Sequence, residues 1–224
     1  MARKDVPETR PALTRARIVQ AAVDLIERSG VEALSMRAVA AEVGVAVMSL
    51  YNHVPNKAAL LEGVAAYVVA GMDLEVADPA ELDWRDQARA LIRAFRKAAH
   101  DHPRCITVLF THKIETPVAL RPAERALALA DAAGFDGPTS VRIMRALLAY
   151  ALGAQLRETS TVEVLDRLPE GLAGVYPGLD PAEYPHVVAL SAELSRHDPE
   201  TDFEFGLDLL ITALDALPRR SRPA

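Results

Sequence analysis

The stretch MRAVAAEVGVAVMSLY, residues 36–51, decides the fold of this chain. Val39 and Val43 lie one helical turn apart on the same face of a predicted helix, and Leu50 continues the apolar side after a turn. Gly44 stands where the chain must reverse, and such a position favours a residue that tolerates a positive φ. The pattern predicts two short helices joined by a tight turn, either a helix-turn-helix or an ordinary hairpin of two helices.

The residues on either side of this motif favour the helix-turn-helix. Residues 50–61, LYNHVPNKAALL, resemble the end of the DNA-binding domain in the tetracycline-repressor family of transcription regulators. That family shows a Leu-Tyr pair, a His, a short turn, an Asn-Lys or Asp-Lys pair and a Leu-rich fourth helix. The first predicted helix also fits, with Thr14 as its N-cap and Gly30 as its terminator. The resemblance covers roughly residues 12–70.

Composition agrees with a helical chain. Half of the 224 residues are apolar and 5% are aromatic, while Ala and Leu are abundant, which suits packed helices better than sheets. The resemblance implies an all-α fold with an N-terminal three-helix helix-turn-helix domain, residues 12–72, and a larger helical effector-binding and dimerisation domain, residues 73–218. Periodicity predicts further helices over 57–73, 84–100, 122–133, 139–158 and 203–217, and a short one opening at Pro103.

Charge is divided unevenly along the chain. Residues 1–62 carry eight Lys or Arg and seven Asp or Glu, whereas residues 63–224 carry seventeen and twenty-four. The formal net charge of −6 therefore arises in the second part, and it does not argue against DNA binding by the first. Residues 1–10 are rich in basic side chains, and they are either an arm that neutralises phosphates or a solvated tail.

Several classes of protein lack their sequence signals here. A single cysteine allows no internal disulfide, and no signal-peptide core or uncharged membrane-spanning run is found. The sequence also shows no glycine-rich phosphate loop, nucleophile elbow or His-Glu-x-x-His run. We expect a soluble cytoplasmic protein that is not an enzyme, carries no cofactor and has no membrane partner.

The resemblance implies which residues read the DNA bases. Arg37 opens the first motif helix, where family members often place a side chain on a base or a phosphate, and an Arg there could bind guanine O6 and N7. Its alternative is an ordinary solvent-facing charge. Val47, Met48 and Ser49 match the first-turn positions of the recognition helix that face base edges. None is charged, so we expect apolar contacts with thymine methyls and a small donor at Ser49.

The resemblance also implies phosphate contacts. Tyr51, His53 and Lys57 match family positions that commonly hold phosphate, and such contacts position a domain without reading sequence. Tyr51 could instead be a core residue with a solvated hydroxyl.

Two later helices predict a homodimer. Each has apolar residues on more than one side, and in the last helix Phe205, Leu209 and Ala213 form the second side. Both sides must be buried, against the core and against something else. The family pairs its last two long helices into a four-helix bundle, and one recognition helix alone buries too little surface for useful specificity. A helix in the middle of a monomeric core is the alternative. The predicted interface consists of Val141, Met144, Leu148, Leu207, Leu210 and Leu214.

The effector site is the least determined part of the sequence. Five residues are spaced to line a cavity between core helices, as ligand sites do in the family that the chain resembles, and plain core packing is the alternative: Phe95, Phe110, Met144, Leu148 and Gln155. The Pro- and Gly-rich loop of residues 168–186 is either a lid over the pocket or a passive connection. His100, His102 and Cys105 are spaced closely enough for zinc, but the run matches no strong structural pattern.

These expectations combine into one function. We expect a homodimeric DNA-binding regulator, most simply a repressor that a small organic effector releases from a palindromic operator. The competitors are a regulator that activates, a metal-responsive regulator, and a helical small-molecule-binding protein whose helix-turn-helix is only structural. The effector, the operator sequence and the regulated genes are not specified by the residues.

Overall fold

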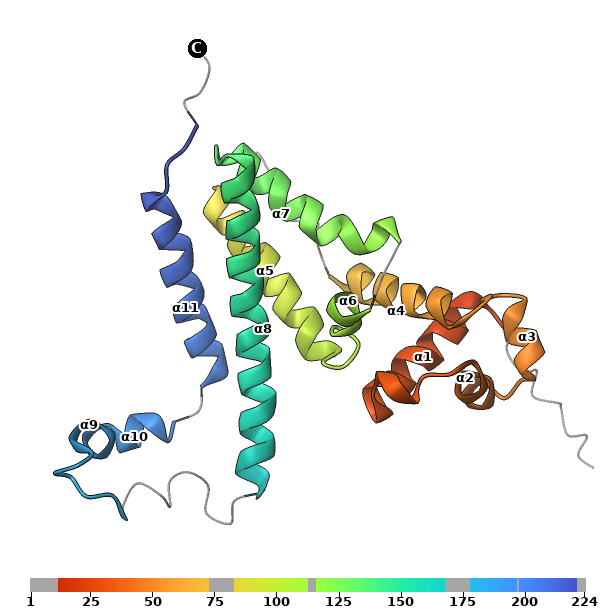
Figure 1. Cartoon of the computed structure of the whole chain (residues 1–224), viewed down its shortest axis with the longest axis horizontal. Helices are drawn as coiled ribbons and strands as arrows, with labels where there is room; N and C mark the ends of the chain where they lie inside the picture. The colour runs from red at the N-terminus through yellow and green to blue at the C-terminus, as the bar shows by residue number, and fades with distance from the viewer. Residues whose placement is uncertain (1–11, 73–82, 113–115, 168–177, 197, 221–224) are drawn as a thin grey trace, which may run out of the picture. The chain divides into compact units, whose positions relative to one another are not determined.

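The computed structural model describes residues 12–72, 83–112, 116–167, 178–196 and 198–220 (Figure 1). Within these ranges the secondary structure is helical and contains no strand, which confirms the all-α prediction. The chain divides into two compact units. The first contains residues 1–71 and 102–121, and the second contains residues 72–101 and 122–224. The basic segment 1–10 lies outside the described residues.

The first unit is built on the predicted helix-turn-helix. Helix α1 contacts both α2 and α4, and α2 contacts α3. The core between them is apolar and fully closed at Ile18, Val39 and Leu60. The bounds are α1 Arg15–Ser29, α2 Met36–Val43, α3 Val47–Tyr51 and α4 Lys57–Gly71.

Short polar side chains begin these helices. The Thr14 hydroxyl accepts a hydrogen bond from the Arg17 N–H, as predicted for an N-cap, and the Ser35 hydroxyl caps α2 in the same way. The Asn56 side-chain oxygen accepts from the Ala59 N–H at 2.8 Å and begins α4. Such caps satisfy N–H groups that have no partner inside a helix.

A segment from the middle of the chain also belongs to the first unit. Helix α6, Val108–Thr111, and a 3-10 turn at Pro117–Leu120 pack against α4. The sequence predicted one short helix that opens at Pro103, whereas α6 begins only at Val108. Instead, the Val108 N–H bonds to the Cys105 carbonyl and the Leu109 N–H to that of Ile106, so this stretch forms tight 3-10-type turns. The predicted domain boundary at 72/73 did not anticipate this segment and stays a prediction.

In the second unit, α8 lies against both α5 and α11 (Figure 1). Phe95, Leu147, Ala151 and Phe203 are buried between these helices. Helix α8 extends well beyond the predicted end at residue 158, because no Gly or Pro lies between that residue and Pro169. The bounds are α5 Trp84–Asp101, α7 Arg121–Ala132, α8 Gly137–Arg167, α9 Pro185–Ala189, α10 Ser191–Leu194 and α11 Pro199–Ala213.

Ion pairs set the register of α5 against α11. Four arginines on successive turns of α5 each bind an acidic residue of α11 or of the 3-10 turn that follows it, and the two helices run antiparallel. The pairs are Arg85–Asp215, Arg89–Asp208, Arg93–Glu204 and Arg96–Glu200. Arg96 also lies over the ring of Phe203 at 4.3 Å, so this end of the row is partly closed to solvent.

Candidate DNA-binding site and partner surfaces

The turn of the helix-turn-helix is closed by Gly44. Its φ of 71° lies in the left-handed region, and its N–H reaches the carbonyls of Ala40 and Ala41 at the end of α2. The Val45 N–H then bonds to the Ala40 carbonyl at 3.0 Å. These bonds reverse the chain within two residues, and α3 begins at Val47.

Helix α3 is anchored by one residue and otherwise open. Leu50 is fully buried, whereas Met48 is 73% exposed and Tyr51 is 43% exposed. Val47 and Ser49 are partly exposed. A large apolar side chain as open as Met48 is unusual in a helix that packs on a core, and it is available for contact with a ligand.

The charged candidates lie on neighbouring elements of the same unit. Arg37 is exposed in the first turn of α2, His53 is exposed in the turn after α3, and Lys57 is exposed at the start of α4. Val54 between them is buried and fixes the path of the turn. The structure therefore brings all seven predicted DNA-contact residues into one unit and leaves each of them at least partly accessible.

Two arginines for which the sequence predicted no such contact hold α2 in place. Arg17 of α1 donates from Nη2 to the Val43 carbonyl at 3.2 Å, at the end of α2. Arg28, at the other end of α1, pairs with Glu42 at 2.8 Å. No local pattern predicts bonds between residues so far apart in sequence, although an arginine at the last carbonyls of a helix is a common arrangement.

A glycine allows α1 and α4 to approach closely. A Cβ built on Gly63 would lie 2.7 Å from Cγ2 of Val19, a distance that Cβ atoms do not adopt. Val19 and Gly63 are both buried. The position of α4 against α1, and with it the start of α4 at Lys57, depends on this contact.

Comparison with known proteins places this architecture in a family. Residues 18–64 match the family model described as "Bacterial regulatory proteins, tetR family", and residues 77–217 match "Tetracyclin repressor-like, C-terminal domain". The chain belongs to the tetR family. It is a DNA-binding regulator of transcription, which confirms the resemblance predicted from residues 12–70.

Relatives match over nearly the whole chain. A transcriptional repressor of Streptomyces coeruleorubidus, DrrR1, is 31% identical over 222 residues, which are 95% of this chain and 81% of the repressor. The structure of SCO7222, a TetR from Streptomyces coelicolor, is 31% identical with a TM-score of 0.74 and covers 94% of this chain and 100% of that one. ActR from the same organism, solved in complex with actinorhodin, is 25% identical with a TM-score of 0.73 and covers 92% and 98%.

The second unit exposes large apolar side chains on both α8 and α11. Phe205 and Leu209, one turn apart on α11, are 67% and 57% exposed, and Leu156 of α8 is 68% exposed. We call the α11 residues Phe205, Leu209 and Ala213 the apolar stripe. Its residues are the second apolar side seen in the sequence, not the side from which Leu207 was chosen.

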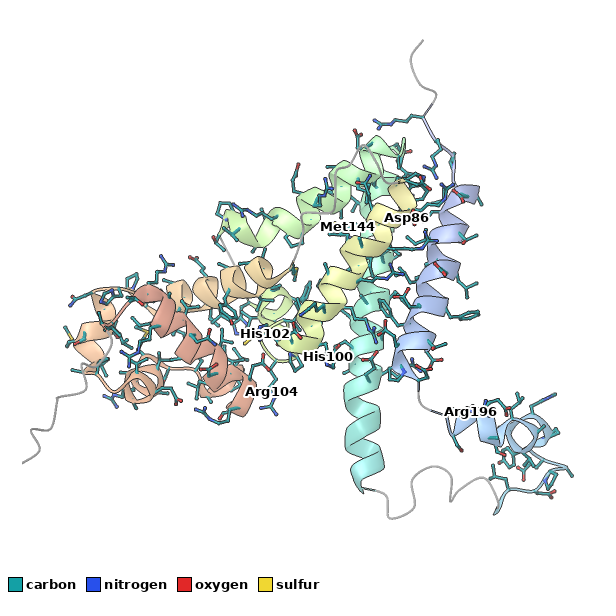
Figure 2. The ribbon with its side chains drawn as sticks, turned by 180° about the vertical axis from the view of Figure 1, so that it is seen from behind. Asp86, His100, His102, Arg104, Met144 and Arg196 are labelled. Carbon is teal, nitrogen blue, oxygen red and sulfur yellow. The ribbon has the colours of Figure 1, made fainter. Side chains whose placement is uncertain are left out.

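The predicted dimer residues divide into two groups. Leu207 is fully buried inside its own chain, so it has no surface left for a partner. The five others are partly exposed: Val141, Met144, Leu148, Leu210 and Leu214. Met144 is labelled on α8 in Figure 2. An interface that uses α8 and α11 therefore stays a prediction, and on α11 the side with Phe205 and Leu209 is the more accessible one.

The five predicted pocket residues do not fall in one unit. Phe110 lies in the first unit and is 47% exposed, whereas the other four belong to the second. Phe95 is buried, and Met144, Leu148 and Gln155 are partly exposed. A cavity of about 490 Å³ in the second unit has a different lining: Arg93, Arg96, Lys97, His100, Glu158, Asp198, Pro199 and Glu200. The predicted pocket stays a hypothesis.

His100, His102 and Cys105 have separate surroundings. His100 is exposed at the end of α5, and the His102 ring packs edge-on against Tyr67 at 5.4 Å. Cys105 is fully buried, and burial raises the pKa of its thiol far above the usual value. Among the described residues, no three His, Cys, Asp or Glu side chains are grouped to hold a metal ion.

The loop of residues 168–186 and the absence of a membrane-spanning segment were also predicted from the sequence. Residues 168–177 of the Pro- and Gly-rich loop lie outside it, and the remainder of that loop runs through exposed turns to α9. None of the described helices is both long and apolar enough to cross a membrane.

Proposed function

We propose that this protein is a homodimeric repressor that binds a palindromic operator and is released by a small organic effector. The observation that carries the proposal is the open recognition helix α3, with Met48 and Tyr51 exposed on a core-anchored helix-turn-helix of the tetR family. DrrR1, a relative that matches 95% of this chain, is a transcriptional repressor.

Base readout is assigned to Arg37 and to the first turn of α3. The Arg37 guanidinium reaches solvent from α2 and has the donor geometry for guanine O6 and N7. Val47 and Met48 offer apolar contact to thymine methyls, and Ser49 offers one small donor or acceptor. A surface with a single charged base reader suits an operator rich in A·T pairs at the α3 contacts.

Phosphate contacts are assigned to Tyr51, His53 and Lys57. All three are exposed at the end of α3 or at the start of α4. They lie outside the first turn of α3, so they fix how the unit docks and leave sequence reading to the other residues.

Dimerisation is assigned to the apolar stripe with the partly exposed residues of α8. Large exposed apolar side chains at one-turn spacing on a long helix are typical of an interface, and the buried side of α11 already fills its own core. Two recognition helices in a symmetric dimer read two half-sites about 34–36 Å apart. The two-fold symmetry of such a dimer accounts for a palindromic operator.

Effector release is the least direct step. ActR has been solved with actinorhodin and with (S)-DNPA, and tetracycline repressors of several classes are among the relatives. By analogy we assign effector binding to the second unit. An effector that favours a dimer shape with a different half-site spacing lowers DNA affinity, and DNA must then lower effector affinity by the same factor.

Two alanine variants test the DNA assignment. Arg37→Ala should weaken binding to the DNA upstream of the protein's own gene by about 1–3 kcal/mol, with a smaller loss on random DNA. Lys57→Ala should weaken binding to both DNAs and lower the salt slope by about one. Fluorescence anisotropy at several salt concentrations measures both effects.

The control is Glu32→Ala, an exposed residue of the same unit outside the motif. Wild-type affinities in both alanine variants at Arg37 and Lys57 would reject these contact assignments. Equal losses on the two DNAs for Arg37→Ala would reassign Arg37 to a phosphate.

A further inference from the structure

Residues 102–111, which we call the plug, complete the core of the DNA-binding unit. Cys105, Ile106 and Val108 are 0%, 2% and 0% exposed, and α6 packs on α4. In sequence the plug directly follows α5, which belongs to the second unit. The chain therefore leaves the first unit after α4, forms α5 and returns with residues that the first unit needs for its core.

Glu27 holds the plug at its first turn. Its Oε1 accepts the backbone N–H of Cys105 at 2.8 Å, and its Oε2 accepts that of Arg104 at 3.2 Å. A carboxylate that binds two consecutive amides with both oxygens forms charge-assisted hydrogen bonds, which are stronger than neutral ones. Figure 2 labels Arg104 and His102 in this segment.

The neighbouring contacts are weaker and do not replace these two bonds. The Cys105 thiol faces the Val23 carbonyl at 3.7 Å, a long sulfur contact, and the His102 ring meets Tyr67 of α4 edge-on. Glu27 is thus a charged side chain that binds the plug backbone directly, through two consecutive amides.

Adjacent residues of α1 connect the plug to the helix-turn-helix. Glu27 binds the plug, and Arg28 pairs with Glu42 of α2 at 2.8 Å. A shift of the plug must either move the end of α1, and with it α2, or break the Glu27 bonds. We propose that Glu27 is a positioning residue that makes the DNA-binding arrangement of α1 and α2 depend on the plug. This inference rests on the proposed function, since it requires a unit that binds DNA.

The test uses the full-length chain and three variants. Glu27→Gln keeps the length of the side chain, but its NH₂ group faces an amide donor, and Glu27→Asp keeps the charge but shortens the reach. Asp24→Asn is the matched control, because Asp24 lies on the same helix and is exposed, with its oxygen bound to Gln20 instead of the plug. Circular dichroism checks that each variant is folded. If Glu27→Gln does not fold, Glu27→Asp is used for both measurements.

The first measurement is hydrogen exchange at the amides of Arg104 and Cys105. Both Glu27 variants should exchange about tenfold faster than wild type, as expected for the loss of a bond to a charged group, and Asp24→Asn should not. Equal rates in all variants would overturn the proposal, because the plug would then be held without Glu27.

The second measurement separates positioning from simple stabilisation. DNA from upstream of the protein's own gene should slow exchange at these two amides in wild type, and the Glu27 variants should bind that DNA about tenfold more weakly than Asp24→Asn. Unchanged DNA affinity in the Glu27 variants would reduce Glu27 to a structural contact. A wild-type protein that binds no DNA would reject the proposed function, and the coupling role with it.

Discussion

Helices α3 and α11 both expose large apolar side chains, but they do so differently. Helix α3 has five residues and one fully buried anchor, Leu50, and its exposed Met48 and Tyr51 belong to the same unit as the exposed Arg37 and Lys57. Helix α11 has fifteen residues and buries a complete face, so its exposed Phe205 and Leu209 form a second apolar side. Exposure alone does not identify a partner, whereas the length of the helix and its surroundings do.

The comparison teaches what each surface is suited to bind. A short helix with mixed polar neighbours presents its first turn to a groove, as in recognition of base edges. A long helix with apolar residues at one-turn spacing presents its side to another helix. The strongest test of this difference places a charge in the stripe of α11.

Leu209→Glu is expected to have the largest effect. In a symmetric dimer the substitution places two carboxylates in an apolar contact, and an unpaired buried charge costs about 3–5 kcal/mol. The dimer dissociation constant should rise about 100-fold or more, as measured by sedimentation velocity. The control is Leu120→Glu, which adds the same charge at an exposed leucine of the first unit.

Far-ultraviolet circular dichroism should show the same helicity in both variants. A dimer that persists in Leu209→Glu, or one that dissociates equally in Leu120→Glu, would remove the stripe from the interface.

Leu207→Ala tests the other side of the same helix. Leu207 is fully buried in its own chain, so its truncation leaves a cavity and should lower the free energy of unfolding by about 2–5 kcal/mol. Measured in a Leu209→Glu background, denaturant unfolding isolates this loss from dimerisation. The half-buried Leu210→Ala should lose less. A small loss at Leu207 and a large one at Leu210 would mean that α11 is rotated relative to this structure.

The two regions also differ in how far the sequence could predict them. The helix-turn-helix is encoded locally, because Gly44, the caps Thr14 and Asn56, and the apolar spacing all act within one or two turns. The face of α11 is not encoded locally, since both sides are apolar and periodicity cannot say which side the chain itself buries. Leu207 was therefore placed in the interface, and the more exposed Phe205 and Leu209 were assigned to a second side.

Contacts between residues far apart in the chain could not be predicted from the sequence for a related reason. Arg17 on the Val43 carbonyl and Glu27 on the plug join residues that no spacing rule connects. The five predicted pocket residues were chosen by helical spacing, which does not reveal that Phe110 belongs to the first unit. Local signals specified the DNA-binding elements, while the partner surface and the cavity required the fold.

Two glycines allow close helix contacts in the two units, Gly63 between α4 and α1 and Gly206 between α11 and α8. A Cβ on Gly63 would meet Cγ2 of the buried Val19 at 2.7 Å, and a Cβ on Gly206 would meet the hydroxyl and two ring carbons of Tyr150. Val19 is branched and buried, whereas Tyr150 is half-buried, so its ring can turn towards solvent at the cost of its hydrogen bond to the Phe203 carbonyl. Gly63→Ala should therefore lower the free energy of unfolding by about 1–3 kcal/mol, and Gly206→Ala by less.

Thermal and denaturant unfolding measure both losses. Gly153→Ala is the control, because nothing lies within 4 Å of its added Cβ and α8 should gain stability from alanine. The prediction fails if Gly206→Ala costs more than Gly63→Ala, since the relative freedom of Tyr150 and Val19 is its basis.

The smallest effect concerns the ion pairs that hold the buried side of α11 to α5. The bond from Arg93 to Glu204, at 2.5 Å, holds the pKa of the Glu204 carboxyl below its usual value. A carboxyl whose pKa is lower in the folded state contributes stability above its unfolded pKa and loses it as the pH falls through the folded pKa.

Arg93 is half exposed, so solvent screens the pair and we expect Glu204→Gln to cost below about 1 kcal/mol near neutral pH. The difference between wild type and Glu204→Gln, measured by denaturant unfolding from pH 7 to pH 3, should shrink towards zero at the acidic end and also in high salt. A difference that grows on acidification would contradict this sign and would mean that the Arg93–Glu204 pair does not stabilise the folded state.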